Sequence, residues 1–337
     1  GLFAPISREG GLVLNNLLLA TACATVFLGT LYPLFLEAVG GAKVSVGPPF
    51  FNATFVPLMV PLLVAVAIGP LLAWKRGDLP AALSRLWAAA VASAIVVLLT
   101  LWLEGGPAGA LLGMGLAAWL VAGALVELAE RIRLFRISLG DSVRRAAHLP
   151  RAAWGMTIAH AGLAATVAGI TASSAWQIER IQLVRPGDKI EIAGYTLSFD
   201  GTQAIEGANY LARVGTFTVT RAGRPVVTLY PEKRCFVVQH MPTTEAAIHT
   251  NFLADLYVVL GDAEGAPANR DCLDEFRQPL DPTTAFTARM YYNPLVPWIW
   301  LGCVIMVMGG IVSLSDRRHR VGAPTRAHAA AAAAAGD

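Results

Sequence analysis

His160 is the residue of this sequence whose type and position most favour chemistry, because it lies inside an apolar run. It stands about six residues into the run Trp154–Ala175. The residues around it are small: Ala159, Ala161, Gly162, Ala164, Ala165 and Gly169. An ionisable side chain in a membrane helix usually faces the bundle interior and has a partner there, and small neighbours let another helix or a flat cofactor approach. A neutral imidazole is a common ligand of haem iron, but composition by itself favours a histidine hydrogen-bonded to a neighbouring helix.

Other polar groups give weaker signals. Asn15 and Asn16 lie near the start of the first apolar run, where two amides can cap the helix, bond to a neighbouring helix or contact a quinone. The segments Glu232–Arg234 and Thr244–Glu245 form a charged group, and we expect its members to pair with one another on a small β domain. The sequence has no Walker loop, G-x-G-x-x-G after a strand, H-E-x-x-H or G-x-S-x-G motif. No catalytic residue is therefore assigned to this chain.

Apolar stretches must position these side chains. The chain has 337 residues, of which 55% are hydrophobic and 15% charged, whereas a soluble domain carries about 25% charge. Crossing a bilayer takes roughly 20 helical residues. The stretches that are long enough run approximately over Leu12–Leu36, Thr54–Trp74, Ser84–Leu103, Ala108–Leu128, Trp154–Ala175 and Leu295–Leu314. The sequence thus predicts a membrane protein with an α-helical transmembrane bundle of about six helices, and it excludes a disordered chain and a small disulfide scaffold.

The distribution of Lys and Arg predicts the orientation of the bundle. With the amino end inside, fourteen basic residues fall on the cytoplasmic side, and the two short external loops hold only Lys43. Under the positive-inside rule, this bias places both termini in the cytoplasm and the long polar segment outside, which for the inner membrane of a Gram-negative bacterium is the periplasm. The net charge of +3 comes from residues beside the apolar stretches, so nothing indicates a nucleic-acid partner.

The polar segment of about 120 residues alternates apolar and polar side chains in the manner of β-strands. Ile190 and Ile192 alternate with charged residues before the turn Ala193-Gly194, and a second turn follows at Ala222-Gly223. The last alternating stretch leads directly into the final apolar run. The pattern predicts an inserted periplasmic domain with a mainly antiparallel, curled sheet. Only for 253–260 does the pattern fail to separate a helix from a strand.

The predicted organisation has four parts. A five-helix transmembrane region covers 1–175, a periplasmic β-rich domain covers 176–293, and a final transmembrane helix covers 294–316. A cytoplasmic Ala-rich tail covers 317–337, and its low-complexity end, Ala327–Asp337, is expected to be mobile. Because the chain opens with Gly1 and no signal-peptide pattern precedes the first apolar run, we expect it to be part of something longer.

The four cysteines divide between two environments. Cys23 and Cys303 lie in apolar runs, whereas Cys235 and Cys272 lie in the polar segment. Their spacing matches no CxxC, CxxCH or zinc motif. In an oxidising compartment, Cys235 and Cys272 could form a disulfide. Two buried free thiols are an equal alternative, because the sequence does not show which strands bring them together.

A set of short segments occurs in order along nearly the whole chain, up to the last apolar run. These segments are Ser7–Gly10 with Leu14–Asn16, Gly29–Pro33, Val46–Asn52, Trp154–Met156 with Ala159-His160, Glu232–Arg234, Thr244–Ile248, Asp255–Tyr257, and Tyr291–Pro294 with Trp298–Trp300. Together they resemble the carboxyl-terminal half of the CcmF family, the integral-membrane haem lyase component of bacterial cytochrome c maturation.

The resemblance implies a function, a cofactor and partners. Similar proteins take haem from a periplasmic haem chaperone and attach it to the CxxCH cysteines of apocytochrome c, alongside the thiol-handling and chaperone subunits of that pathway. They also carry a b-type haem held by two transmembrane histidines, which passes electrons from quinol to the incoming haem. His160 matches the second of these histidines. The resemblance thus implies that His160 binds haem b as an axial ligand of its iron.

The family's tryptophan-rich haem-handling segment, its two periplasmic histidines and its first transmembrane histidine all precede the region that matches this chain. We therefore expect a fragment or one piece of a split system, a haem lyase subunit that is not active alone and takes its second axial ligand from the amino-terminal half. Two alternatives remain. The chain could be a structural scaffold that docks partners without a cofactor, or a membrane transporter with His160 as a proton relay.

Overall fold

The computed structural model describes residues 3–41, 43–266, 271–279 and 281–316, and the chain forms two compact units. A helical unit contains Gly1–Val167 and Leu301–Asp337, and a β unit contains Ala168–Trp300. The expected Ala-rich tail at 317–337, with four of the basic residues counted for the orientation, lies outside the described residues.

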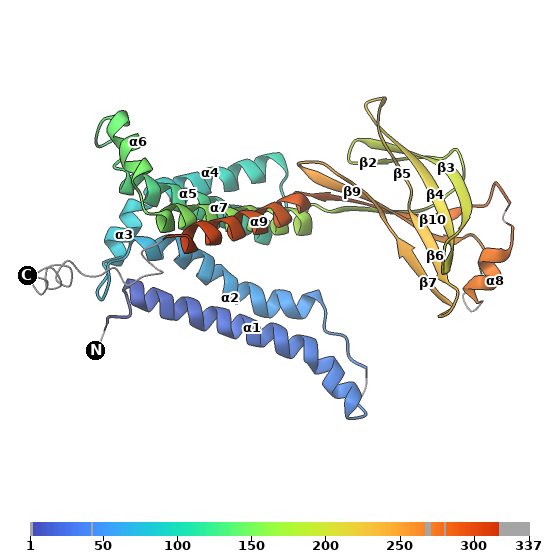
Figure 1. Ribbon diagram of the computed structural model, residues 1–337, viewed down its shortest axis with the longest axis horizontal. Helices are drawn as coiled ribbons and strands as arrows, with labels where there is room; N and C mark the ends of the chain where they lie inside the picture. The colour runs from blue at the N-terminus through green and yellow to red at the C-terminus, as the bar shows by residue number, and fades with distance from the viewer. Residues whose placement is uncertain (1–2, 42, 267–270, 280, 317–337) are drawn as a thin grey trace, which may run out of the picture. The chain divides into compact units, whose positions relative to one another are not determined.

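The helices follow the apolar stretches (Figure 1). In chain order, the elements up to the start of the β unit's sheets are α1 (Arg8–Ala38), α2 (Pro48–Ile68), the 3-10 turn η1 (Gly69–Leu71), α3 (Leu79–Arg85), α4 (Trp87–Leu103), α5 (Ala108–Arg131), α6 (Leu139–Ala147) and α7 (Arg151–Ala175), and the last helix is α9 (Val296–Leu314). Among the described residues, five helices are long and apolar enough to cross a membrane. The number rises to six if α3 and α4 together make one span, so the predicted bundle of about six helices is confirmed.

Two predicted stretches differ from the helices in detail. The stretch Ser84–Leu103 does not form one straight helix, because α3 and α4 meet at an angle of 58° around Leu86. The second helix begins at Pro48 rather than near Thr54. Pro48 and Pro49 occupy its first turn, where proline is favoured because its missing N–H would be unpaired there in any case. The double proline thus starts the second helix.

The β unit is a sandwich of two antiparallel sheets, which confirms the predicted β domain (Figure 1). One sheet has the order β1-β10-β9-β8, and the other has β2-β3-β4-β6-β7 with β5 also paired to β4. The strands are β1 (Ile178–Val184), β2 (Lys189–Ile192), β3 (Tyr195–Glu206), β4 (Tyr210–Arg221), β5 (Arg224–Leu229), β6 (Glu232–Phe236), β7 (Met241–Glu245), β8 (Ala247–Thr250), β9 (Ala254–Ala263) and β10 (Phe286–Pro294). The segment 253–260, which the sequence left open, forms most of β9.

Alternating residues of both sheets build the core of the sandwich. Leu197, Phe199 and Phe217 of one sheet and Val258 and Met290 of the other are completely buried in one cluster. The two predicted turns join β2 to β3 and β4 to β5 as tight hairpins, because Ala193 and Gly194, like Ala222 and Gly223, all have positive φ. Both turns therefore lie where the alternation placed them.

A short helix is fastened to the sandwich by a disulfide. Cys235 of β6 is bonded to Cys272 of α8 (Cys272–Arg277), with the two Cα atoms 5.9 Å apart. The predicted disulfide is therefore confirmed, and the alternative of two free thiols is wrong. Arg213 of β4 secures the other end of α8, because its guanidinium donates to the carbonyl oxygens of Glu275 and Gln278.

Candidate functional site

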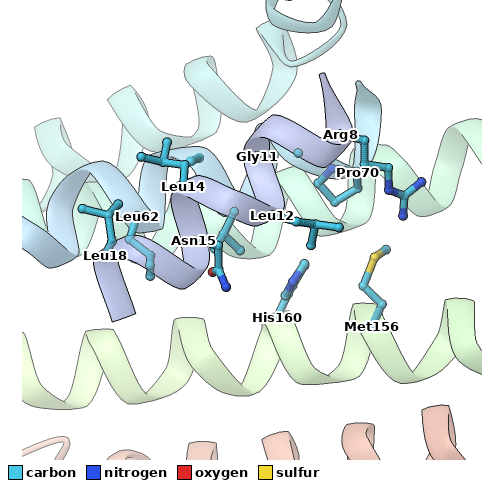
Figure 2. Close-up of a pocket in the computed structure, with 13 residues that line it drawn as sticks. Arg8, Gly11, Leu12, Leu14, Asn15, Leu18, Leu62, Pro70, Met156 and His160 are labelled. Carbon is cyan, nitrogen blue, oxygen red and sulfur yellow. The ribbon is translucent and has the colours of Figure 1, made fainter. Parts of the chain in front are cut away.

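A pocket of about 250 Å³ opens beside His160 in the helical unit (Figure 2). Most of its lining is aliphatic, and the remainder comes from a cation, an amide, a thioether and the imidazole. The residues that line it are Arg8, Gly11, Leu12, Leu14, Asn15, Leu18, Leu62, Ala65, Val66, Gly69, Pro70, Met156 and His160. Ligand sites of proteins have this character, with volumes of roughly 300–1,000 Å³, so this space can hold part of a cofactor.

One face of α1 forms one wall of the pocket. Arg8, Gly11, Asn15 and Leu18 follow one another at steps of three or four residues, which places them on one side of a helix. No Cβ is present at Gly11, and one added there would meet no atom within 4 Å. The glycine therefore leaves open space at the centre of this wall.

The first turn of α1 is held in place by the segment that follows η1. Ser7 caps the helix, and its hydroxyl oxygen accepts from the backbone N–H of Gly10 at 3.0 Å. The backbone N–H of Arg8 donates to the carbonyl oxygen of Ala73, and a carboxylate oxygen of Glu9 accepts from the backbone N–H of Lys75. These bonds fix where the Arg8 side chain begins.

The opposite wall comes from α7. Met156 and His160 are four residues apart, so their side chains lie one above the other on the same face. Figure 2 shows the imidazole of His160 pointing from α7 towards α1, where Leu12 and Asn15 lie. This orientation brings residues of α1 and α7, which are far apart in the sequence, to one pocket.

The far face of α7 is packed against α9. Gly155 and Gly162 meet Gly309 and Gly302 so closely that a Cβ on Gly162 would stand 2.6 Å from the carbonyl oxygen of Gly302. Two residues along an α-helix turn the side chain by about 200°. His160 therefore points away from α9 because Gly162 points towards it.

A further contact fixes the start of α7. The backbone N–H of Ala152 donates to a carboxylate oxygen of Asp316, just beyond α9, at 3.1 Å. An acidic side chain at a helix amino terminus satisfies an otherwise unpaired N–H group and complements the helix dipole. The glycine contacts and this cap together set the rotation of α7 about its axis and its position along α9, and thereby the position of His160.

The charges around the pocket have one sign. Among the described residues that line it there is a guanidinium but no carboxylate. The guanidinium of Arg8 lies over the ring of Trp74, 4.9 Å from its centre. Within the described part of the chain, the imidazole of His160 has no hydrogen-bond or ionic partner. The simple expectation from composition, a histidine bonded to a neighbouring helix, is therefore not what the structure shows.

The other polar groups singled out from the sequence have structural roles. The capping role considered for Asn15 and Asn16 is wrong, because Ser7 caps α1; the two amides lie 3.4 Å from each other, and Asn15 also lines the pocket. In the β unit, Arg234 pairs with Glu232 at 2.7 Å and with Glu245 at 3.7 Å, as expected of a charged group that is satisfied internally. Lys233 pairs with Asp262 of β9, and burial lowers the pKa of this lysine.

Sequence reasoning missed Arg8 and Gly11 as lining residues. Arg8 counted only towards the membrane orientation and as part of a motif. The spacing of Arg8, Gly11 and Asn15 was available as a signal, since these residues share one helix face. The sequence does not show which face of α1 meets α7, because that depends on contacts between helices more than 110 residues apart in the sequence.

The comparisons with known proteins agree with this architecture. The family model described as the CcmF C-terminal beta-sandwich matches residues 175–294, which make up nearly all of the β unit. The cytochrome c-type biogenesis protein CycK of Bradyrhizobium diazoefficiens is 47% identical over 332 residues, covering 98% of this chain and 47% of the relative. The chain is a CcmF-type protein.

Other CcmF proteins support the same assignment. That of Pseudomonas aeruginosa is 39% identical over 96% of this chain and 46% of the relative, and that of Escherichia coli is 36% identical over 93% and 44%. Among solved structures, a chain described as the cytochrome c haem lyase CcmF has the same fold, with a TM-score of 0.68 at 24% identity, over 93% of this chain and 46% of that one.

The resemblance drawn from the motifs is thus confirmed, and the CcmF-type chain is a multi-pass membrane protein with a β-sandwich. It spans about half the length of the curated relatives that it matches.

Proposed function

We propose that this chain is the part of a cytochrome c haem lyase that supplies one axial ligand to a b-type haem in the membrane. The ligand is His160, and the second axial histidine comes from the amino-terminal half of the lyase. The observation that carries the proposal is the imidazole of His160, which has no polar partner among the residues that the structure describes. The packing of the opposite face of α7 holds this imidazole facing a pocket.

The residues present fit the cofactor. A haem needs an imidazole nitrogen that no other group occupies and an apolar surface for its ring. His160 and the leucines of α1 and α2 provide these two features in one pocket. The pocket is smaller than a typical site for a large ligand, which agrees with a site that is completed by a second polypeptide segment.

When bound, the haem would supply one-electron transfer, a chemistry that imidazole ligands suit. This chain's residues have three tasks in that chemistry. His160 would hold the iron, the glycine contacts of α7 fix the position of the imidazole, and the aliphatic lining would exclude water. The names of the relatives support a role in cytochrome c biogenesis.

The proposed partners follow from the same role. They are the amino-terminal half of the lyase, a periplasmic haem chaperone, and apocytochrome c with its thiol-handling and chaperone subunits, with quinol as the candidate electron donor. The proposed location is the bacterial inner membrane, with the β unit in the periplasm. The supporting observation is the excess of basic residues on one side of the helices.

The proton-relay alternative has less support, because the described residues that line the pocket include no carboxylate to exchange a proton with His160. The acids near the end of α5 are engaged elsewhere, since Glu127 pairs with Arg131 and Glu130 with Arg85.

The decisive experiment measures haem in the complete assembly, in which this chain is expressed together with its amino-terminal partner. We expect His160→Ala to abolish or severely weaken the reduced b-type bands. His160→Gly with added imidazole should restore part of the signal, because the free ligand can occupy the vacated space. This chain alone should bind haem poorly or in a five-coordinate form.

The matched control is His148→Ala, which removes an exposed histidine at the end of α6. Its haem content and spectrum should equal those of the wild type. If His160→Ala retains its haem and an unaltered reduced spectrum, the ligand assignment is wrong. A structural scaffold without its own cofactor would then be the better description of this chain.

A further inference from the structure

Arg8 is a cation at the rim of an apolar pocket that has no acid in its described lining. Its contact with Trp74 is a cation–π interaction, which leaves the charge unneutralised. No ion pair joins Arg8 to any carboxylate in the described part of the chain. The neighbouring Glu9 is directed elsewhere, because it accepts from the backbone N–H of Lys75.

The backbone positions from which the side chains of Arg8 and His160 extend are each held by contacts with neighbouring segments. The backbone bond from Arg8 to Ala73 and the Ser7 cap hold the start of α1, while the glycine contacts hold α7. Figure 2 shows the Arg8 guanidinium and the Met156 thioether on the same side of the His160 imidazole. An anionic group of a ligand bound at His160 would meet Arg8 on that side.

We infer that Arg8 is the positioning residue that binds a propionate carboxylate of the haem held by His160. This inference rests on the proposed function. A guanidinium can donate two parallel hydrogen bonds to a carboxylate, which would fix the orientation of the bound haem. The aliphatic side chains around it reduce solvent screening of the pair.

The pairing has an electrostatic consequence for the iron. With two neutral imidazoles, the ferric centre carries one more positive charge than the ferrous centre. An unbalanced propionate favours the ferric state by Coulomb attraction, and the Arg8 charge offsets that preference. Arg8 therefore raises the midpoint potential, which a purely structural role at the start of α1 would not do.

The test compares the binding affinities of haem and of haem dimethyl ester, whose propionates carry no charge. Both are measured with the haem-free assembly of this chain and its amino-terminal partner. Wild-type protein should bind the ester about tenfold or more weakly than haem, as expected for the loss of a hydrogen-bonded charge pair. Arg8→Gln should bind haem as weakly as wild type binds the ester, and should no longer distinguish the two ligands. The haem bound to Arg8→Gln should have a lower midpoint potential than the haem bound to the wild type. Arg8→Lys should have a midpoint potential between these two, because it keeps the positive charge.

The control is Arg151→Gln, which removes an exposed arginine at the start of α7. It should leave both affinities and the potential unchanged. Equal binding of haem and ester by wild type overturns the inference without the use of any variant. A second outcome also overturns the inference: the Arg8→Gln protein keeps the midpoint potential of its haem but binds vesicles with anionic lipid less well than the wild type. Arg8 would then bind a lipid headgroup. Loss of haem in His160→Ala with no effect of Arg8→Gln rejects only this inference, whereas retention of haem in His160→Ala rejects the proposed function.

Discussion

Gly162 of α7 and Gly302 of α9 are in backbone contact, since a Cβ on Gly162 would stand 2.6 Å from the carbonyl oxygen of Gly302. The same relation recurs seven residues away between Gly155 and Gly309. Close approach of this kind is how helices associate in a bilayer, where apolar side chains gain little by leaving lipid. The glycines thus decide which face of α7 remains for the pocket.

Gly162→Leu should disrupt this packing and the pocket together. Because the added side chain meets backbone rather than a movable side chain, we expect a loss of about 1–3 kcal/mol in unfolding free energy, measured by thermal unfolding in detergent, and a loss of bound haem. Gly310→Leu is the control, since a Cβ at Gly310 meets no atom within 4 Å. Equal stability of the two variants would contradict the role of the glycine contact.

Gly11→Leu should fill the pocket without disturbing the helices. A Cβ at Gly11 has no neighbour within 4 Å, and Gly11 is part of the pocket wall. We expect the complete assembly to keep its unfolding temperature and to lose most of its b-type haem. Gly109→Leu places the same side chain in open space on α5 and should retain haem. Full haem content in the Gly11 variant would show that the cofactor lies elsewhere.

The disulfide should stabilise the β unit. Cys235 and Cys272 are 37 residues apart, and closing a loop of that length stabilises by roughly 3–4 kcal/mol in the chain-entropy model. Replacing both cysteines by Ala should lower the unfolding free energy of the β unit by about this amount. Replacement of Cys23 and Cys303, which are exposed on the helices, is the control. Mass spectrometry of non-reduced peptides checks the bond, and free thiols at 235 and 272 would disprove it.

Asp271 should make the attachment of α8 sensitive to acid. The backbone N–H of Leu273, and next the side chain of His240, stabilise its carboxylate and lower its pKa from the usual value near 3.8. The folded state therefore holds its proton more weakly than the unfolded state. The stabilisation is fully present above the unfolded pKa, and it is lost as the pH falls from about 5 through the folded pKa.

Asp271→Asn keeps a residue that can cap α8 but removes this titration. Thermal unfolding of the β unit between about pH 3 and 7 should show a flatter pH dependence for Asp271→Asn than for the wild type. Asp274→Asn, an exposed acid in the same helix, serves as the control. If Asp271→Asn loses stability at low pH to the same extent as the wild type, Asp271 is not the source of the acid sensitivity.

The orientation predicted from the basic residues can be tested with enzyme fusions. Alkaline phosphatase joined after Gly201 should be active, because this position of β3 is expected in the periplasm. The same enzyme joined after Arg136, between α5 and α6, should be inactive. The opposite result would reverse the membrane orientation and with it the proposed location of the β unit.

The sequence by itself determined the local elements. The apolar length of each stretch predicts the helices, because a bilayer demands about 20 residues without charge. The period-two pattern around Ile190 and Ile192 predicts strands, and the Ala-Gly pairs predict the turns between them. The ordered motifs, including Ala159-His160, predict the family. These features depend on neighbouring residues only, so they can be read along the chain.

The tertiary structure decided which residues meet. The break at Leu86 and the pairing of Cys235 with Cys272 depend on contacts between distant segments, which leave no periodic pattern in the sequence. The pocket also depends on contacts between distant segments. Arg8 and Gly11 of α1 reach His160 only because backbone contacts of Gly162 turn the imidazole away from α9. The sequence could single out a histidine in an apolar run, but the packing of a glycine two residues away decides where that histidine points.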